Sequence, residues 1–427
     1  MKKFKKKTAG GIWFLFLVCL SALFLGIPCQ AEEKGIIYKD ASGMNSWWCY
    51  PLSVTWEKKK IFTTYTTAEG YCGVMERNLQ NGKVRRINLA KFAVDDHNAG
   101  AVELLEDGRI LYIVTGHSEK KYLEIFISKK PGDISHWKKR RLKAEGWVTY
   151  AQIVRTKKGY FLFTRERWND KLENGKKESH WCWLVSFSRD GENWKDPCRL
   201  IDSGKHQYYL KAVPCTDSTD IRLIMYAHPN LNSSAIRQAF FNIDTWEVSS
   251  TKGKVLGKAE AGGTGVDNKT VPKILERNQR RRRILDVGKT EKEQAWISFA
   301  EFDDETNAEY KVGVYSKKTK NMNLYDVTMS GEAFYARSRY FGGMCFDTEN
   351  PRTLYLSRKE GDFWYIEKWH YEKKQYVFKR VIKKSRKNLI RPFAAEYGGK
   401  LQWIEGTYAR DSFKTFETMI ATKKIKK

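Results

Sequence analysis

The stretch DDHNAGAVELLEDGRILYIVTGH, residues 95–117, has the pattern of a β-hairpin. Small and apolar residues alternate with others through AGAVELL, EDG is a turn signal, and RILYIVTG is rich in Ile, Val and Tyr. Residues at equal distances from a hairpin turn lie side by side, so we expect His97 and His117 to meet at its open end. Three further polar residues stand at the same end: Asp95, Asp96 and Asn98. Either histidine alone would be an ordinary polar cap, whereas two converging histidines indicate a site.

Similar strand-rich units precede and follow this hairpin with a period of about 50 residues, which is typical of repeat architectures. Most units show strand, Asp or Gly turn, strand, and then a second hairpin that often ends in an aromatic residue. Long amphipathic stretches are hard to find, so the sequence predicts an all-β protein: a seven-bladed β-propeller of four-stranded antiparallel blades. Two β-sandwiches are the alternative, but the regular spacing and the lack of a linker favour a single propeller over residues 32–427. A strand before Trp47 could complete the last blade.

The first 31 residues have the three parts of an export signal. MKKFKKK is basic, an apolar run spans Ile12 to Ile27, and Cys29-Gln30-Ala31 offers a cleavage point after Ala31. The run is short for a membrane anchor, which needs about 20 residues. We therefore expect a signal peptide over 1–31, a secreted protein and no membrane attachment after its removal.

The chain carries a formal net charge of +28, of which the signal accounts for five lysines. A basic surface attracts polyanions, although dispersed lysines also serve solubility. The sequence shows no helix-turn-helix, zinc-finger or RNA-binding pattern, so we expect no nucleic-acid partner. An exported basic protein could meet an anionic polysaccharide, a cell-wall polymer or an anionic lipid, and the charge fits an anionic ligand without identifying one. We expect a monomer. None of the cysteines forms a CxxC pair, which argues against a zinc ribbon or a redox motif.

Two turns resemble Asp boxes, which are structural turns of sugar-associated propellers. Ser188 to Trp194, SRDGENW, has the S-x-D-G-x-x-W form, and Ser128 to Trp137 is a longer variant. We expect each Asp to accept hydrogen bonds within its turn and each Trp to pack beneath it.

The hairpin, with TYAQIV, FLFTRE, YYLKA, HP and YFGGMCFDTENPRTLYLSR, resembles the BNR-repeat polysaccharide lyases, of which the ulvan lyases are the best-known members. This resemblance implies five catalytic residues: His97, His117, Tyr150, Arg165 and Tyr209. Expected substrate-binding residues are Asn98, Lys211, Arg339 and Tyr340. The chain departs from relatives in the fourth unit, where QYYLKA replaces a pattern closer to RPYVKY. Some relatives hold a structural metal around the hairpin that follows the HP motif. Here His228 is present without clear further ligands, so we expect no metal and no cofactor.

Lyase chemistry on a uronate requires that the carboxylate charge be offset, that a base take the neighbouring proton and that an acid protonate the leaving oxygen. Arg165 can bind a carboxylate as a fork, and Asn98 can add a neutral donor. His97, His117, Tyr150 and Tyr209 can carry protons, and which is base and which is acid stays open. Considered alone, Arg165 could be a partner in a surface ion pair, and Tyr150 or Tyr209 could be an aromatic residue that packs within a blade. The alternatives are a sialidase-like glycoside hydrolase, for which we find no carboxylate pair beyond Asp95 and Asp96, and a non-catalytic polysaccharide-binding propeller.

Overall fold

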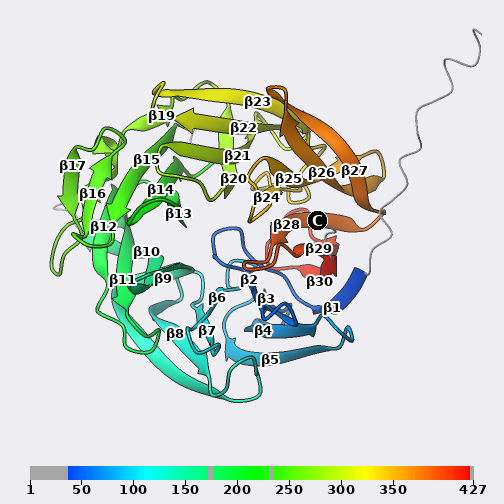
Figure 1. Cartoon of the computed structure of the whole chain (residues 1–427), viewed down its shortest axis with the longest axis horizontal. Helices are drawn as coiled ribbons and strands as arrows, with labels where there is room; N and C mark the ends of the chain where they lie inside the picture. The colour runs from blue at the N-terminus through cyan, green and yellow to red at the C-terminus, as the bar shows by residue number, and fades with distance from the viewer. Residues whose placement is uncertain (1–36, 172–176, 230–234, 424–427) are drawn as a thin grey trace, which may run out of the picture.

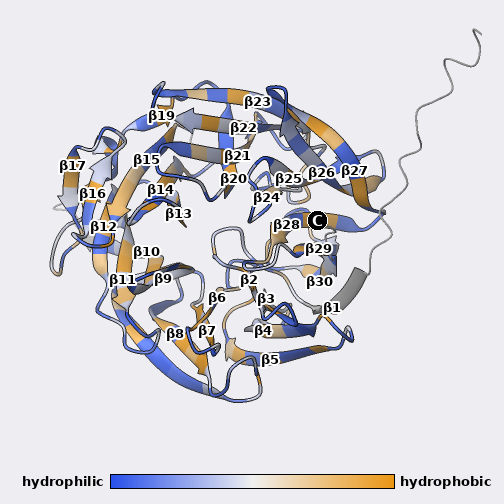
Figure 2. Cartoon of the chain, in the orientation of Figure 1, coloured by the Kyte–Doolittle hydropathy of each residue, from blue (hydrophilic) through white to orange (hydrophobic). Residues whose placement is uncertain are grey.

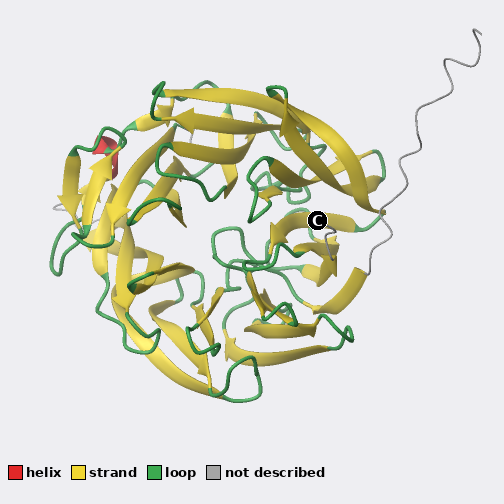
Figure 3. Cartoon of the chain, in the orientation of Figure 1, coloured by secondary structure: helices red, strands yellow, loops and turns green. Residues whose placement is uncertain are grey.

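The computed structural model describes residues 37–171, 177–229 and 235–423 of the chain, with the side chains of 37–42, 170–171 and 177 left out. The predicted signal peptide lies outside these residues. The described chain is a ring of β-sheets, with a single three-residue helical turn, η1 (Asn268–Thr270), in the described part (Figures 1 and 3). The predicted fold class, an all-β propeller, is thus confirmed. The sheets are arranged around a common centre, which excludes a pair of β-sandwiches. The described residues include no helix of a length and apolarity suited to crossing a bilayer.

Four of the sheets have four antiparallel strands each. The first contains β2 (Ser53–Trp56), β3 (Lys60–Thr66), β4 (Tyr71–Asn78) and β5 (Val84–Lys91). The second contains β20 (Arg281–Val287), β21 (Gln294–Phe302), β22 (Glu309–Ser316) and β23 (Asn321–Met329). The third contains β24 (Met344–Phe346), β25 (Thr353–Glu360), β26 (Phe363–Glu372) and β27 (Gln375–Ser385). The fourth contains β28 (Asn388–Ala394), β29 (Leu401–Tyr408), β30 (Phe416–Lys423) and β1 (Ile37–Ser42).

Two larger sheets make up the rest of the ring. An eight-stranded sheet contains β6 (Ala101–Leu104), β7 (Ile110–Val114), β8 (Lys120–Ser128), β9 (Trp137–Thr156), β10 (Gly159–Lys171), β11 (Lys177–Ser188), β12 (Cys198–Gly204) and β18 (Val266–Asp267). A six-stranded sheet contains β13 (Tyr208–Pro214), β14 (Asp220–Ala227), β15 (Ile236–Asn242), β16 (Glu247–Ser250), β17 (Val255–Lys258) and β19 (Lys273–Leu275).

The predicted number and size of the blades are therefore wrong. The described residues form six hydrogen-bonded sheets, not seven separate four-stranded ones, and the pair β12–β18 is parallel. The cause lies in β9, whose 20 residues remain extended over a length that spans two units of the repeat. Its first half pairs with β8 and its second half pairs with β10, so two expected units share one strand.

The N-terminal strand closes the ring, as the sequence predicts. β1 pairs with β30, so the two ends of the described chain complete one sheet. The chain then crosses the middle of the ring between β1 and β2 (Figure 1). We call residues 44–52 the central segment. It is fixed at both ends, since Met44 exchanges backbone hydrogen bonds with Thr66, and Tyr50 bonds Ala151 and Ile153 on β9.

Apolar side chains fill most of the space between and within the sheets, although several arginines, such as Arg165 and Arg391, are buried among them. Outer strands carry exposed basic residues. All five residues of β7 are buried, as are all eight of β14. By contrast, the KKRR run at the start of β9 is exposed, and Figure 2 shows hydrophilic colour along the rim of the ring. The exposed part of the positive charge is therefore dispersed over the outer strands.

Both Asp-box predictions are confirmed. Asp190 accepts hydrogen bonds from the Ser188 hydroxyl at 2.9 Å and from two backbone N–H groups, and Trp194 donates to the Gly191 carbonyl at 2.9 Å. Gly191 has φ +76°, a conformation that most residues avoid. In the longer variant Trp137 donates to the Ile134 carbonyl at 2.7 Å. These turns are structural.

Candidate active site

The hairpin of residues 95–117 has the predicted register and brings its two histidines into contact. Ala101 pairs with Ile113 and Leu104 pairs with Ile110, so the residues before β6 and after β7 lie at the same end. The rings of His97 and His117 stack with their centres 4.2 Å apart. The prediction that they converge is confirmed.

Asp95 connects the two histidines by accepting a hydrogen bond from each. Its Oδ1 lies 2.5 Å from Nδ1 of His97, and its Oδ2 lies 2.9 Å from Nδ1 of His117. Asp96 adds a second contact of 2.8 Å to Nδ1 of His97. Because both Nδ1 atoms face carboxylates, each histidine keeps Nε2 for other contacts, and Nε2 of His97 lies 3.3 Å from the Tyr340 hydroxyl.

The two histidines differ in charge although their rings touch. Burial disfavours the charged form of His97, but Asp95 and Asp96 outweigh it and raise its pKa to about 9. Burial and the neighbouring positive charge of His97 lower the pKa of His117 to about 4, against the effect of Asp95. At neutral pH, His97 is therefore an imidazolium, whereas His117 is neutral with a lone pair on Nε2.

Tyr150 enters the site from a bulge in β9. The pairing of β9 with β10 shifts between Phe163 and Arg165, and Tyr150 has φ +68°, which a bulky residue rarely adopts. Thr164 stabilises the bulge by donating to the Tyr150 carbonyl at 2.8 Å. The phenol hydroxyl of Tyr150 is buried and has no hydrogen-bond partner among the described residues. Burial holds the pKa of Tyr150 well above its usual value, so it carries its proton.

Arg165 is a fixed, buried cation beside Tyr150. Its guanidinium carbon lies 4.7 Å from the centre of the Tyr150 ring, 4.6 Å from Trp181 and 5.3 Å from Tyr209. The side chain is only 1% exposed. The amide oxygen of Gln207, when it faces Arg165, accepts from both Nη atoms at 2.9 and 3.0 Å. A carboxylate could take the same two hydrogen bonds.

Tyr209 completes a stack of four rings through the middle of the site. Trp48 of the central segment stacks on His97 at 5.0 Å between ring centres and on Tyr209 at 4.9 Å. With His117 on the far side of His97, the order is His117, His97, Trp48, Tyr209. Trp48 thus fixes the distance between the hairpin and β13.

The structure brings the five predicted catalytic residues together within one group of touching side chains. Tyr150 lies 6.1 Å from His97, 6.2 Å from His117 and 6.2 Å from Tyr209, measured between ring centres. Four of the five are 5% exposed or less, and solvent reaches His117, whose side chain is 26% exposed. A ligand would therefore approach from the His117 side.

The four predicted substrate-binding residues take different places. Tyr340 belongs to the cluster, since its hydroxyl lies 3.3 Å from Nε2 of His97. Asn98 supports the hairpin by accepting from the His117 N–H at 2.8 Å and donating to the Ala93 carbonyl. Lys211 points elsewhere, against the Tyr50 ring at 4.1 Å, and Arg339 is half-buried within electrostatic range of Asp304.

Several residues that sequence reasoning missed support this site. Asp96 forms a fully buried ion pair with Arg391 at 2.5 Å and accepts from Tyr408 at 2.8 Å. Arg283 lies 4.4 Å from the centre of the Tyr340 ring. Trp48 stands in the sequence WWCY, residues 47–50, but only the crossing of the central segment places it here. Arg391 and Arg283 lie about 300 and 190 residues away from His97 in sequence, and no local pattern marks them.

Among the described residues, one group could jointly hold a metal ion: Asp95, His97 and His117. One ligand atom of each lies within 4.8 Å of the others. An ion there would replace both Nδ1 hydrogen bonds to Asp95 and the proton of the His97 imidazolium. The donor set is thus occupied by a proton-bonded network, which fits a metal poorly. The absence of a metal stays a prediction.

Comparison with known proteins gives the family. The model of the BNR repeat-containing family matches residues 60–326, well over half of the chain. The chain belongs to this family. No curated protein sequence matches the BNR-repeat protein.

Solved structures share its fold. The BNR-repeat protein is similar to a PL25 ulvan lyase, described as a polysaccharide lyase, with a TM-score of 0.63 and 14% identity over 90% of this chain and 95% of the other. A second structure of a PL25 ulvan lyase is bound to a (1-4)-linked glucuronic acid–rhamnose 3-sulfate repeat. It has a TM-score of 0.62 and 14% identity over 91% of this chain and 94% of the other. An α-L-arabinofuranosidase from Fusarium graminearum has a TM-score of 0.43 and 9% identity over 75% of this chain and 91% of the other. This similarity is too low to carry an argument. At these identities the comparisons establish the fold alone.

Proposed function

We propose that the protein is a polysaccharide lyase that cleaves a uronate-containing anionic polysaccharide by β-elimination. The observation that carries this proposal is the contact of two histidines, two tyrosines and one arginine in a single buried cluster. The cluster supplies a fixed cation, a neutral base and a protonated acid, which are the three requirements of the reaction. The similarity in fold to a structure with bound glucuronic acid supports a uronate as substrate.

Arg165 and His97 would offset the charge of the substrate carboxylate. The guanidinium is held between Trp181 and Tyr150, so it need not reorganise when the enolate-like dianion forms. His97 adds a second permanent positive charge at neutral pH, because Asp95 and Asp96 hold its proton. Two cations in a water-poor site stabilise the dianion more than the carboxylate of the ground state.

His117 would take the proton, and Tyr150 would give one to the leaving oxygen. Among the five residues, His117 is both neutral, with a pKa of about 4, and reachable by solvent. Tyr150 keeps its proton, and its hydroxyl has no partner among the described residues, so it is available to the glycosidic oxygen. Tyr209 then serves as a wall of the site beside Arg165.

Gln207 holds the place of the carboxylate in the absence of substrate. Its amide oxygen accepts from both Nη atoms of Arg165, and the residue is half-buried at the edge of the site. A substrate carboxylate would displace this amide and form shorter, charge-assisted hydrogen bonds.

Hydrolase chemistry suits the cluster less well. A glycoside hydrolase needs a protonated carboxylic acid beside the scissile bond. Against the effect of burial, His97 and His117 hold the pKa of Asp95 below its usual range, and Arg391 and His97 do the same for Asp96. Neither carboxyl group can then act as the acid. A non-catalytic sugar-binding protein remains the second candidate, since four of the five side chains are at most 5% exposed.

The decisive experiment incubates the protein with a panel of uronate polymers and follows the ultraviolet absorbance of the unsaturated uronate. We expect absorbance to grow with wild-type protein and the rate to fall by roughly 100-fold or more in His117→Ala and Tyr150→Phe. Tyr160→Phe is the matched control, because Tyr160 is equally buried but donates to the Leu104 carbonyl, at the turn end of the hairpin and away from the two histidines. Binding without absorbance would support the non-catalytic candidate, and new reducing ends without absorbance would support a hydrolase.

We further propose that the protein acts outside the cell, as a monomer, on an anionic polysaccharide. The export signal of residues 1–31 and the basic outer strands support this location and this partner. Detection of a mature protein that begins near residue 32 in culture medium would test the export.

A further inference from the structure

A second cavity lies at the other end of the inner strands. The candidate active site uses residues at or before the first residues of these strands, such as Tyr209 on β13 and Tyr340 before β24. The cavity is lined by residues further along these strands, such as Lys211 on β13, and by residues beyond strand ends, such as Lys289 after β20, Thr348 after β24 and Glu396 after β28. The strands run along the central channel, so the two sites face its opposite ends.

The central segment separates the two sites. Trp48 stacks on Tyr209 at 4.9 Å, and two residues further on Tyr50 lies against Lys211, whose ammonium is 4.1 Å from the ring centre. Tyr209 and Lys211 point to the same side of β13 because the side chains of a strand alternate. The cavity, of about 60 Å³, thus occupies the next level of the channel and reaches solvent near Lys289, whose side chain is 27% exposed.

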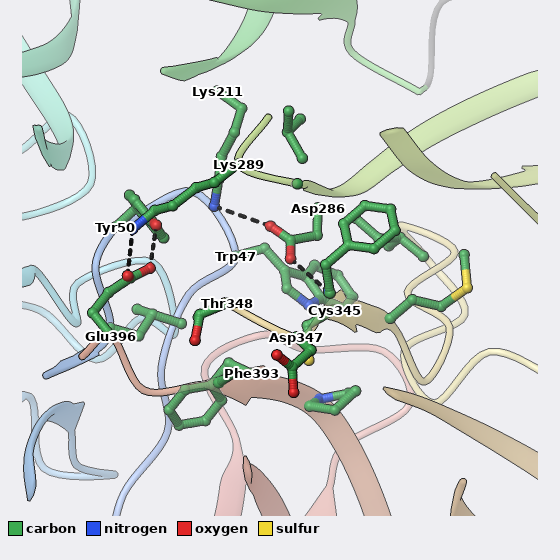
Figure 4. A pocket seen from close by; sticks show the side chains of 18 of the residues that line it. Trp47, Tyr50, Lys211, Asp286, Lys289, Cys345, Asp347, Thr348, Phe393 and Glu396 are labelled. Atoms are coloured by element: carbon green, nitrogen blue, oxygen red, sulfur yellow. Dashed lines mark hydrogen bonds and ion pairs between the residues drawn. The ribbon is translucent and has the colours of Figure 1, made fainter. Parts of the chain in front are cut away.

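Acidic and basic side chains both line this cavity (Figure 4). Glu396 accepts from the Tyr50 hydroxyl and from Lys289. Lys211 lies 3.6 Å from Asp286, beyond ordinary hydrogen-bond length, so its N–H groups have capacity for another acceptor. Asp347 also lines the cavity, so two ammonium groups face three carboxyl groups, and burial raises the pKa of Asp286. Both kinds of group can hydrogen-bond to a neutral ligand.

Two polar atoms of the lining have no hydrogen-bond partner in the described part of the chain. They are the indole Nε1 of Trp47 and the hydroxyl of Thr348, and both atoms are shielded from solvent. A buried polar group without a partner costs about 1–3 kcal/mol, so these two require an acceptor from a ligand or from water. Trp47 and Phe393 also contribute apolar faces to the lining.

We propose that this cavity binds the hydroxylated edge of one neutral sugar residue. Hydroxyl groups both accept, as Lys211, Thr348 and Trp47 require, and donate, as Asp286 and Glu396 require. The volume exceeds the roughly 10–15 Å³ that one water molecule needs, so the cavity has room for more than one hydroxyl group. The site gives the protein a second contact with a glycan, and it is independent of the proposed lyase reaction.

The test measures binding of the neutral monosaccharides rhamnose, xylose and glucose by saturation-transfer NMR and calorimetry on the full protein. Wild type should bind at least one of them, and Thr348→Val and Lys211→Met should each weaken that binding at least tenfold. His117→Ala should leave it unchanged, as should Lys317→Met, the control for loss of a lysine, because Lys317 is exposed and pairs with Glu293. Circular dichroism confirms that each variant is folded.

Three results would overturn the inference. The first is that wild type binds none of the sugars. Water would then be the hydrogen-bond partner of the Trp47 indole N–H and the Thr348 hydroxyl. The second is binding that survives Thr348→Val and Lys211→Met but is lost in His117→Ala, which would assign the sugar to the candidate active site. The third is saturable binding of sodium acetate or sodium sulfate in place of sugars. Lyase activity in Thr348→Val reports on the proposed function separately.

Discussion

Deprotonation of His97 at high pH should destabilise the folded protein by an amount that the site geometry sets. The folded-state pKa of about 9 lies above the ordinary value of 6.5, because Asp95 and Asp96 stabilise the imidazolium against burial. The difference of about 2.5 pKa units, at about 1.36 kcal/mol each, corresponds to about 3 kcal/mol. A group with a raised pKa contributes fully below its unfolded pKa, so this stability is present below about pH 6.5 and is lost as pH rises through 9.

The assay is urea unfolding of wild type and His97→Gln from about pH 6 to pH 10. Groups outside the cluster titrate in both proteins, so the difference between the two free energies of unfolding reports on His97 and on His117, whose pKa the charge of His97 lowers. We expect wild type to lose about 3 kcal/mol relative to His97→Gln across this range. Imidazole NMR signals, assigned by their loss in the variant, should show one histidine that titrates near pH 9.

Parallel stability curves for the two proteins would refute the reasoning. So would a His97 resonance that titrates at or below about pH 7. Either outcome would mean that the two carboxylates do not hold the proton of His97, and the proposed second cation of the active site would be lost with it.

Four other predictions concern the same cluster. Arg165→Lys should lower kcat/KM by about 100-fold or more in the absorbance assay, because an ammonium cannot form the fork between Trp181 and Tyr150, and unchanged kinetics would remove Arg165 from carboxylate binding. Gln207→Glu should raise KM strongly while Gln207→Ala does not, since a resident carboxylate would stay on the Arg165 fork; equal effects would contradict the placeholder role. Asp96→Asn should cost about 3–5 kcal/mol in urea unfolding, because it leaves Arg391 buried without its counter-ion, and a cost below about 1 kcal/mol would contradict this. Prolonged dialysis against a chelator should leave both lyase rate and melting temperature unchanged, whereas loss that zinc restores would show that Asp95, His97 and His117 hold a metal after all.

The local features of the site were predictable because hairpin geometry is local. Residues on either side of an EDG turn must lie opposite each other, so the contact of His97 with His117 follows from sequence spacing alone. Asp-box turns are likewise closed by bonds within seven residues. The positions of Tyr150, Arg165 and Tyr209 came from the family resemblance, and the structure brings their side chains to the histidines.

Only the tertiary structure decided the rest, because contacts between distant segments leave no local pattern. The extended conformation of β9 across an expected boundary depends on pairing with both β8 and β10, and this overturned the predicted set of separate blades. The pKa difference between His97 and His117 depends on burial and on which carboxylate each Nδ1 faces. The central segment has the largest effect on the two sites. By crossing the ring, it places Trp48 in the candidate active site and Tyr50 in the second cavity. Lys211 packs against Tyr50 there, away from the histidines. Sequence spacing determined which side chains could meet within a hairpin, and the closure of the ring determined which hairpins meet.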